Sequence, residues 1–285
     1  MRIERELQAH IRAAFEMVND GPAGSSFPPP ATLSDALTKA LPPGTALHVA
    51  PKMVPGIAKM FTTASVNMWM RSVHSFLVSA SLTNVSPVWA SVSGYYSSHY
   101  SVRAMAHLLG FFQLFGRKRT VRLEIQGGRF VCSMSKSTVH DREHRFYWRV
   151  VKLNSLFASD PFFSQNDSAT DQSDVAHRDY ANYIDHLPHF PVFRPLDAEA
   201  LRSRIDRISE IEIESPPIPR VSRYPDLESV QIVAYHRIVR FRDLLDAVLG
   251  TSNRFWNVHH DPAWAREFMD FQLTEEPGLA AEFSL

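Results

Sequence analysis

The stretch from Ser75 to Val102 contains no Asp, Glu, Lys or Arg, which strongly limits what this chain can fold into. A stretch of this length is long enough to cross a lipid bilayer. It also holds nine serines together with Asn84, Pro87 and His99, so we reject a membrane span. A pair of helices inside a large core explains the pattern better, because buried helices lose their charged face.

Apolar residues at helical spacing predict further helices along the chain. The clearest covers residues 226–250, where Gly250 marks the end and one apolar stripe is formed by Val230, Ala234, Ile238, Phe241, Leu245 and Val248. Ser86 and Pro87 suit the N-cap and the first turn of a helix that runs to about residue 109. Other helices are expected over residues 2–18, 32–41 and 62–82, from about 146 to 157, from about 197, and once after 251.

Alternating apolar residues replace the helical pattern around residues 117–136. The segments TVRLEIQ and RFVCSMS flank Gly127 and Gly128, which predicts a β-hairpin with a Gly-Gly turn. The predicted fold is therefore mainly α, a helical bundle with an inserted β-hairpin. We expect a helical extension over residues 1–60, the core over 61–250 and a helical tail over 251–285.

The composition describes a globular protein. The chain has 285 residues, 45% of them hydrophobic and 11% aromatic, and a net charge of zero, which excludes a disordered chain. Cys132 is the only cysteine, so no intramolecular disulfide forms, which fits a reducing cytoplasm. The N-terminus lacks the apolar core of a signal peptide. We therefore expect a cytoplasmic protein without a membrane anchor.

The zero net charge is the sum of two oppositely charged halves of the chain. Residues 1–150 carry 17 Lys and Arg against 8 Asp and Glu, a net charge of +9, and residues 151–285 carry −9. The stretch 36–136 has 11 basic residues and one acid, Glu124. Arginine, which suits phosphate, supplies 24 of the 30 basic residues. The basic half is expected to face nucleic acid; alternatively, the two halves neutralise each other within the fold.

The segment 94–110 reads GYYSSHYSVRAMAHLLG and carries a resemblance to a known family. Its paired tyrosines, followed after six residues by Arg103 and Ala104, resemble a signature of the HEPN superfamily. These are bacterial and archaeal four-helix domains of toxin–antitoxin and antiphage systems. The resemblance implies a helical bundle that acts on RNA, pairs as a homodimer and works with a protein partner of a defence complex.

A second landmark of that family precedes its last core helix. Arg178, Ala181 and Tyr183 match an Arg-x-x-Ala-Asp-Tyr pattern, with Asn182 in place of the Asp. Catalytic relatives instead carry Arg, four to six residues, then His. Here His186 follows Arg178 after seven residues, whereas the pair Arg254 and His259 has the required spacing. These four residues are the catalytic candidates that the resemblance implies.

The spacing of polar residues on the helix at 94–110 suggests a pocket. Tyr96, Arg103 and His107 share one helical face, and Arg178 or Tyr183 could complete the pocket. Histidine can move the 2′-OH proton and arginine can hold the charge on phosphate, as metal-independent RNA cleavage requires. The alternative is a buried polar network that joins the helices.

The hairpin is the other candidate site. A basic hairpin can bind a nucleic-acid backbone or dock on a partner's sheet edge; alternatively, charge protects an exposed edge strand. Its basic residues are Arg117, Lys118, Arg119, Arg122 and Arg129. No zinc-type, phosphate-loop or nucleotide-binding motif is present, so no metal or cofactor is expected.

The sequence therefore leaves two main functions open. The first is a protein of a bacterial defence or toxin-type system that acts on RNA, as a metal-independent ribonuclease or as the nucleic-acid-facing subunit of a complex. The second is a non-catalytic binding or regulatory subunit of an antiphage complex. Charge-driven self-assembly is a third interpretation.

Overall fold

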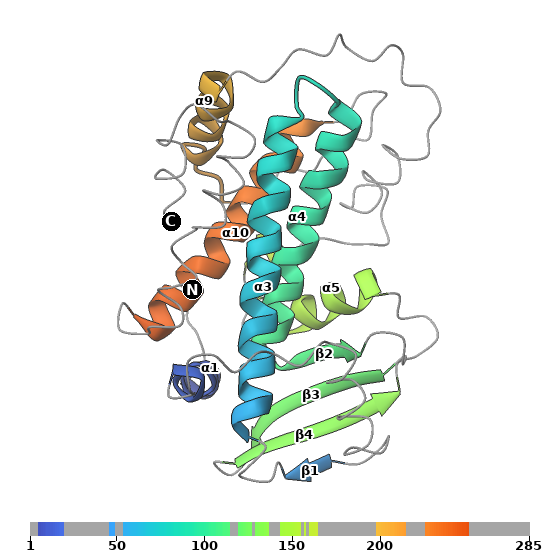
Figure 1. The fold of residues 1–285 in the computed structure, drawn as a ribbon, viewed down its shortest axis with the longest axis vertical. Helices are drawn as coiled ribbons and strands as arrows, with labels where there is room; N and C mark the ends of the chain where they lie inside the picture. The colour runs from blue at the N-terminus through green and yellow to red at the C-terminus, as the bar shows by residue number, and fades with distance from the viewer. Residues whose placement is uncertain are drawn as a thin grey trace.

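The computed structural model describes residues 5–19, 46–48, 54–114, 119–126, 129–136, 143–154, 157, 160–164, 198–214 and 226–250. Within these ranges the architecture is mainly α, as predicted. Two long antiparallel helices stand beside each other, with a small sheet at one end of the pair (Figure 1). The helices are α1 (Arg5–Asn19), α3 (Val54–Ser81), α4 (Pro87–Leu108), α5 (Glu143–Leu153), α7 (Pro161–Ser164), α9 (Ala198–Ser209) and α10 (Leu227–Leu249).

The uncharged stretch forms the last two turns of α3, a turn and most of α4, which confirms the predicted buried pair. Serine hydroxyls of α3 and α4 bond to each other inside the interface: the Ser72 hydroxyl lies 2.6 Å from that of Ser101 and donates to the Ser97 carbonyl at 2.7 Å. Small side chains let the two helices approach closely, and these serine hydroxyls keep hydrogen-bond partners. None of the described helices is both long and apolar enough to cross a membrane.

Helix α10 packs against both long helices. All six residues of its predicted apolar stripe are buried. Trp69 of α3 stacks on Phe241, with ring centroids 6.1 Å apart, and donates from Nε1 to the Ile238 carbonyl at 3.2 Å. Asp226 caps the start of α10 by accepting from the Ser229 amide, and Gly250 ends the helix as expected. Helix α1 joins the same core through Ile11 and Phe15.

The sheet is antiparallel, with strand order β1-β4-β3-β2. Strands β3 (Arg119–Gln126) and β4 (Arg129–Lys136) are the predicted hairpin, and their register pairs Leu123 with Cys132. The sequence did not reveal β2 (Phe111–Leu114) on one edge or β1 (Ala46–His48) on the other. The predicted hairpin is therefore the centre of a four-stranded sheet, whose strand β1 comes from a segment before α3.

Gly110 connects α4 directly to β2. Its φ is 81°, a left-handed conformation that side chains other than glycine rarely adopt. A Cβ at this position would lie 2.1 Å from the Leu123 carbonyl oxygen, while the Leu123 amide donates to the Gly110 carbonyl at 2.9 Å. The glycine thus fixes the sheet tightly against the end of α4.

The observed start of α3 differs from the predicted one. Helix α3 begins at Val54 and not near residue 62, because Pro55 and Gly56 are tolerated in its first turn, where backbone amides need no helical partner. The helices expected over residues 32–41 and after 251 lie outside the described residues.

Candidate functional site

The edge of the sheet formed by β2, which lies next to α4 and α5 (Figure 1), brings an arginine and an aromatic ring together. Phe111 of β2 and Arg122 of β3 are direct partners in the strand register. The guanidinium carbon of Arg122 lies 5.0 Å from the centroid of the Phe111 ring, a cation–π geometry. The Arg122 side chain is 53% exposed, and Phe111 is partly exposed. A flat cation over a ring is one of the surfaces on which an unpaired base can stack.

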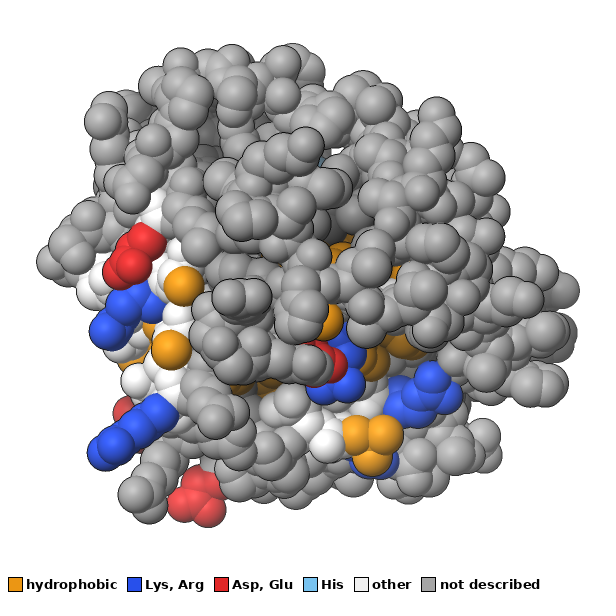
Figure 2. Space-filling model, turned by 90° about the horizontal axis from the view of Figure 1, so that it is seen from below, with side chains coloured by type: hydrophobic (Ala, Val, Ile, Leu, Met, Phe, Trp, Pro, Cys, Tyr) orange, Lys and Arg blue, Asp and Glu red, His pale blue; other side chains and the backbone are white. Residues whose placement is uncertain are grey.

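Glu124 holds the Arg122 guanidinium in place through an ion pair. Both side chains reach solvent, so water screens the attraction and a phosphate could take the place of the carboxylate. Figure 2, which views the molecule from below relative to Figure 1, shows both basic and acidic side chains among the described residues visible from that side.

The other basic residues predicted for this site are distributed around it. Arg119 lies at the start of β3, opposite Lys136, and Arg129 lies at the start of β4, opposite Gln126. Arg117 and Lys118 lie outside the described residues, immediately before β3. Arg122 is thus the hairpin arginine whose side-chain contacts the structure defines.

The predicted pocket face of α4 packs against α5. The guanidinium carbon of Arg103 lies 5.0 Å from the centroid of the Tyr147 ring, and the ring of His107 lies 5.5 Å from the same centroid. Tyr96 contacts the rings of Tyr95 and Tyr100, with centroids 5.3 and 6.0 Å away. Tyr147 also accepts from the Gln113 amide of β2. The polar face therefore joins α4, α5 and the sheet.

His107 lies in the core and not at a surface. Its side chain is 1% exposed, and Nδ1 lies 2.9 Å from the Phe111 carbonyl oxygen, so this nitrogen carries the proton. Burial first, and then the charge of Arg103, lower the pKa of His107 to about 3. His107 is consequently neutral at pH 6–8. This geometry favours a polar network over proton transfer for this residue.

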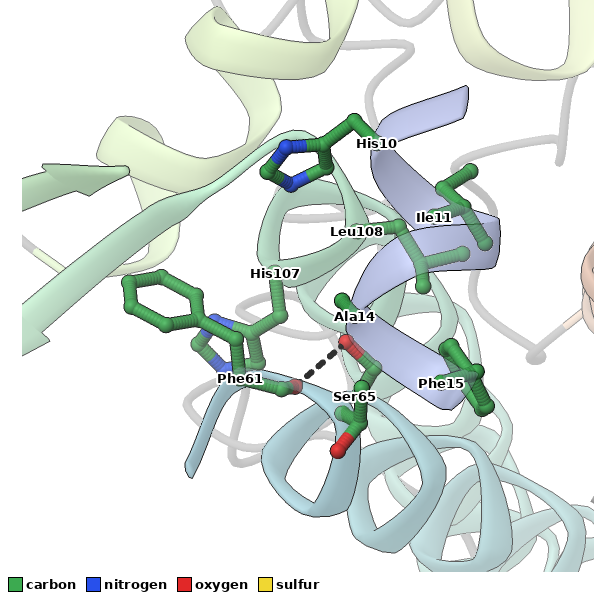
Figure 3. Close-up of a pocket in the computed structure, with 9 residues that line it drawn as sticks. His10, Ile11, Ala14, Phe15, Phe61, Ser65, His107 and Leu108 are labelled. Carbon is green, nitrogen blue, oxygen red and sulfur yellow. Dashed lines mark hydrogen bonds between the residues drawn. The ribbon is translucent and has the colours of Figure 1, made fainter. Parts of the chain in front are cut away.

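Helix α1 closes a pocket beside His107 (Figure 3). Four of its residues contribute to the walls, and α3 and α4 supply the rest. The lining residues are His10, Ile11, Ala14, Phe15, Phe61, Thr62, Ser65, His107 and Leu108. His10, which is 8% exposed and faces the core from α1, could not be identified from the sequence, because a lone histidine on an apolar stripe carries no motif.

The catalytic candidates Arg178, His186, Arg254 and His259, together with Tyr183, lie outside the described residues. Within the described part of the chain, no cluster of three or more His, Cys, Asp or Glu residues could hold a metal ion. The sequence analysis also missed Phe111 and Tyr147, which contribute rings to the two clusters. The only signal for Phe111 was its place directly after the Gly110 break.

Among family models, curated proteins and solved structures, nothing matches this chain.

Proposed function

We propose that this protein binds nucleic acid, with RNA as the expected class, through the edge of the sheet formed by β2 and β3. The observation that supports this function best is the exposed Arg122 guanidinium above the Phe111 ring. The ring, which packs against the core, supports the guanidinium, and the guanidinium offers a plane on which a base can stack or bidentate hydrogen bonds to a phosphate.

The order of charges along the chain supports the same site. The predominantly basic stretch 36–136 contains β2, β3 and β4, and in the sequence Arg117 and Lys118 directly precede Arg119, the first residue of β3. Basic residues beside a stacking surface would follow a phosphate backbone and make binding sensitive to salt. Since the sheet carries Glu124 as well, the interface is local and does not extend over the whole face.

The resemblance to the HEPN superfamily suggests the biological system in which this protein acts. We infer a cytoplasmic protein of a bacterial defence or toxin-type system that acts as a nucleic-acid-facing subunit, as a homodimer and with a protein partner. The binding function is favoured over cleavage because His107, the described histidine of the proposed pocket, is buried and neutral at pH 6–8.

A direct test combines binding and cleavage. Purified full-length protein is mixed with a labelled single-stranded RNA in EDTA at pH 6, 7 and 8, and both complex formation and fragments are measured. Binding with intact RNA supports the proposal, and absence of binding contradicts it. Cleavage that disappears in Arg178→Ala, or in Arg254→Ala with His259→Ala, would instead establish a metal-independent ribonuclease.

A further inference from the structure

The guanidinium of Arg122 is contacted on one face and on one edge. The Phe111 ring lies against its face, with the guanidinium carbon 5.0 Å from the ring centroid. Glu124, two residues further along β3 and on the same face of the sheet, forms an ion pair with Nε. The Arg122 side chain is still 53% exposed, so its second face is open to a ligand.

The neighbouring strands place uncharged residues beside this ion pair. On the β2 side, the register partner of Arg122 is Phe111 itself. On the β4 side, the partner of Arg122 is Ser133 and the partner of Glu124 is the buried Val131. None of these register partners is charged, so the carboxylate of Glu124 is the charge that the sheet places next to the guanidinium.

A second arginine shows the same arrangement in a closed form. Arg240 of α10 lies over the Phe162 ring, with the guanidinium carbon 3.8 Å from the centroid, and its Nε pairs with the Asp160 carboxylate at 2.9 Å. Its side chain is 24% exposed, and Phe162 is fully buried. There the arrangement joins two parts of the fold. At Arg122 the same arrangement lies open to solvent, which suits it to an external ligand.

A guanidinium can bind a nucleotide in two ways. Its N–H groups can bond to a phosphate, and its flat surface can stack on a base. A phosphate at Arg122 would lie close to the carboxylate of Glu124, and the two negative charges repel each other. An uncharged base that stacks on the open face leaves the ion pair intact. The arrangement therefore favours a base over a phosphate at this position.

Only an unpaired nucleotide can offer its base in this way, because the bases of a double helix are already stacked on each other. We propose, on the basis of the nucleic-acid site proposed above, that this site selects unpaired nucleotides over a double helix and that Glu124 sets this selectivity by opposing phosphate. The phosphate of a stacked nucleotide still lies within a Debye length of Arg122, so binding remains sensitive to salt.

The test compares a labelled single-stranded RNA that has no internal base pairs with the same strand annealed to its complement. Dissociation constants of the full chain are measured at one salt concentration. The wild type should bind the single strand about tenfold more tightly or better, which corresponds to about one stacked base. Glu124→Gln removes the charge and keeps the size of the side chain. It should raise the affinity for the duplex by about two- to fivefold, as expected for an exposed ion pair, and so reduce the preference.

Glu228→Gln is the matched control, because Glu228 also forms an exposed ion pair, with Arg207, away from the sheet. It should leave the preference unchanged. Arg122→Lys is a second variant, which keeps the charge but loses the flat surface. It should weaken binding of the single strand by about tenfold and leave duplex binding nearly unchanged.

Equal affinities of the wild type for the two RNAs, or a preference that Glu124→Gln leaves unchanged, would overturn the proposed selectivity while RNA binding itself stands. A wild type that binds neither form would contradict the proposed nucleic-acid function, and the selectivity with it.

Discussion

The guanidinium carbon of Arg122 lies 5.0 Å from the centroid of the Phe111 ring, and the two residues face each other across neighbouring strands. The backbone carbonyl of Phe111 also accepts a hydrogen bond from the buried His107. This edge of the sheet is thus anchored to α4 through the same residue that supports Arg122.

Phe111→Ala should weaken binding of single-stranded RNA by about 1–3 kcal/mol, since a stacking partner for one base is lost. Binding is measured by fluorescence anisotropy with a labelled oligonucleotide. Trp89→Ala is the control, because Trp89 is a 60% exposed aromatic residue on α4, a different element. Equal losses in both variants would show that the ring at position 111 has no special role.

Gly94→Ala should destabilise the fold by about 1–3 kcal/mol, because the interior has no room for a methyl group there. A Cβ on Gly94 would lie 2.6 Å from Cγ1 of Val230 and 3.1 Å from the Ser79 hydroxyl. The free energy of unfolding is measured in urea. Val230→Ala removes the clashing methyl, so the double variant should lose less than the two single losses added together. Strict additivity would argue against this contact.

The free energy of unfolding should fall as the pH drops from 7 to 5. The pKa values of His10 and His107 are lowered in the fold, so protons bind preferentially to the unfolded chain, and stability is lost below 6.5. Each residue contributes a loss of about 2 kcal/mol at pH 5. Urea titrations at both pH values measure the sum. A His107→Gln variant with the wild-type pH dependence would contradict this account.

Cys132 should resist thiol reagents in the native protein. It is 1% exposed in β4, and burial raises the pKa of its thiol to about 11, so almost no thiolate forms at pH 8. Labelling with a thiol reagent should proceed in urea and be slower by orders of magnitude in buffer. Rapid labelling in buffer would show that the sheet opens far more often than its packing allows.

Most of the helices could be predicted from the sequence, because the spacing of apolar residues that marks a helix involves residues close to each other in the chain. The stripe of α10 and the uncharged helix pair follow from spacing alone, as does the alternation of β3 and β4. Strands β1 and β2 are too short to carry an alternation, and their pairing depends on segments distant in the sequence. Strands β1 and β2 could therefore be identified only in the structure and not from the sequence.

The sequence supplies the residue types of the candidate sites but not their environments. Arg122, one of the basic residues of the hairpin, has a side chain that is 53% exposed. The burial of His107 depends on α1, β2 and α5, which the sequence of its own helix does not report. His10 and Tyr147 acquire their importance only from the residues that the fold brings next to them.

The most direct test of the central claim is the salt dependence of RNA binding by wild type, Arg122→Glu and Arg71→Glu. Arg71 is an exposed arginine of α3, so its reversal changes the net charge equally at a different place. We predict that Arg122→Glu weakens binding about tenfold or more and reduces the salt slope by about one, while Arg71→Glu retains near wild-type affinity. Equal effects of both variants, or none, would contradict a nucleic-acid site at the edge of the sheet.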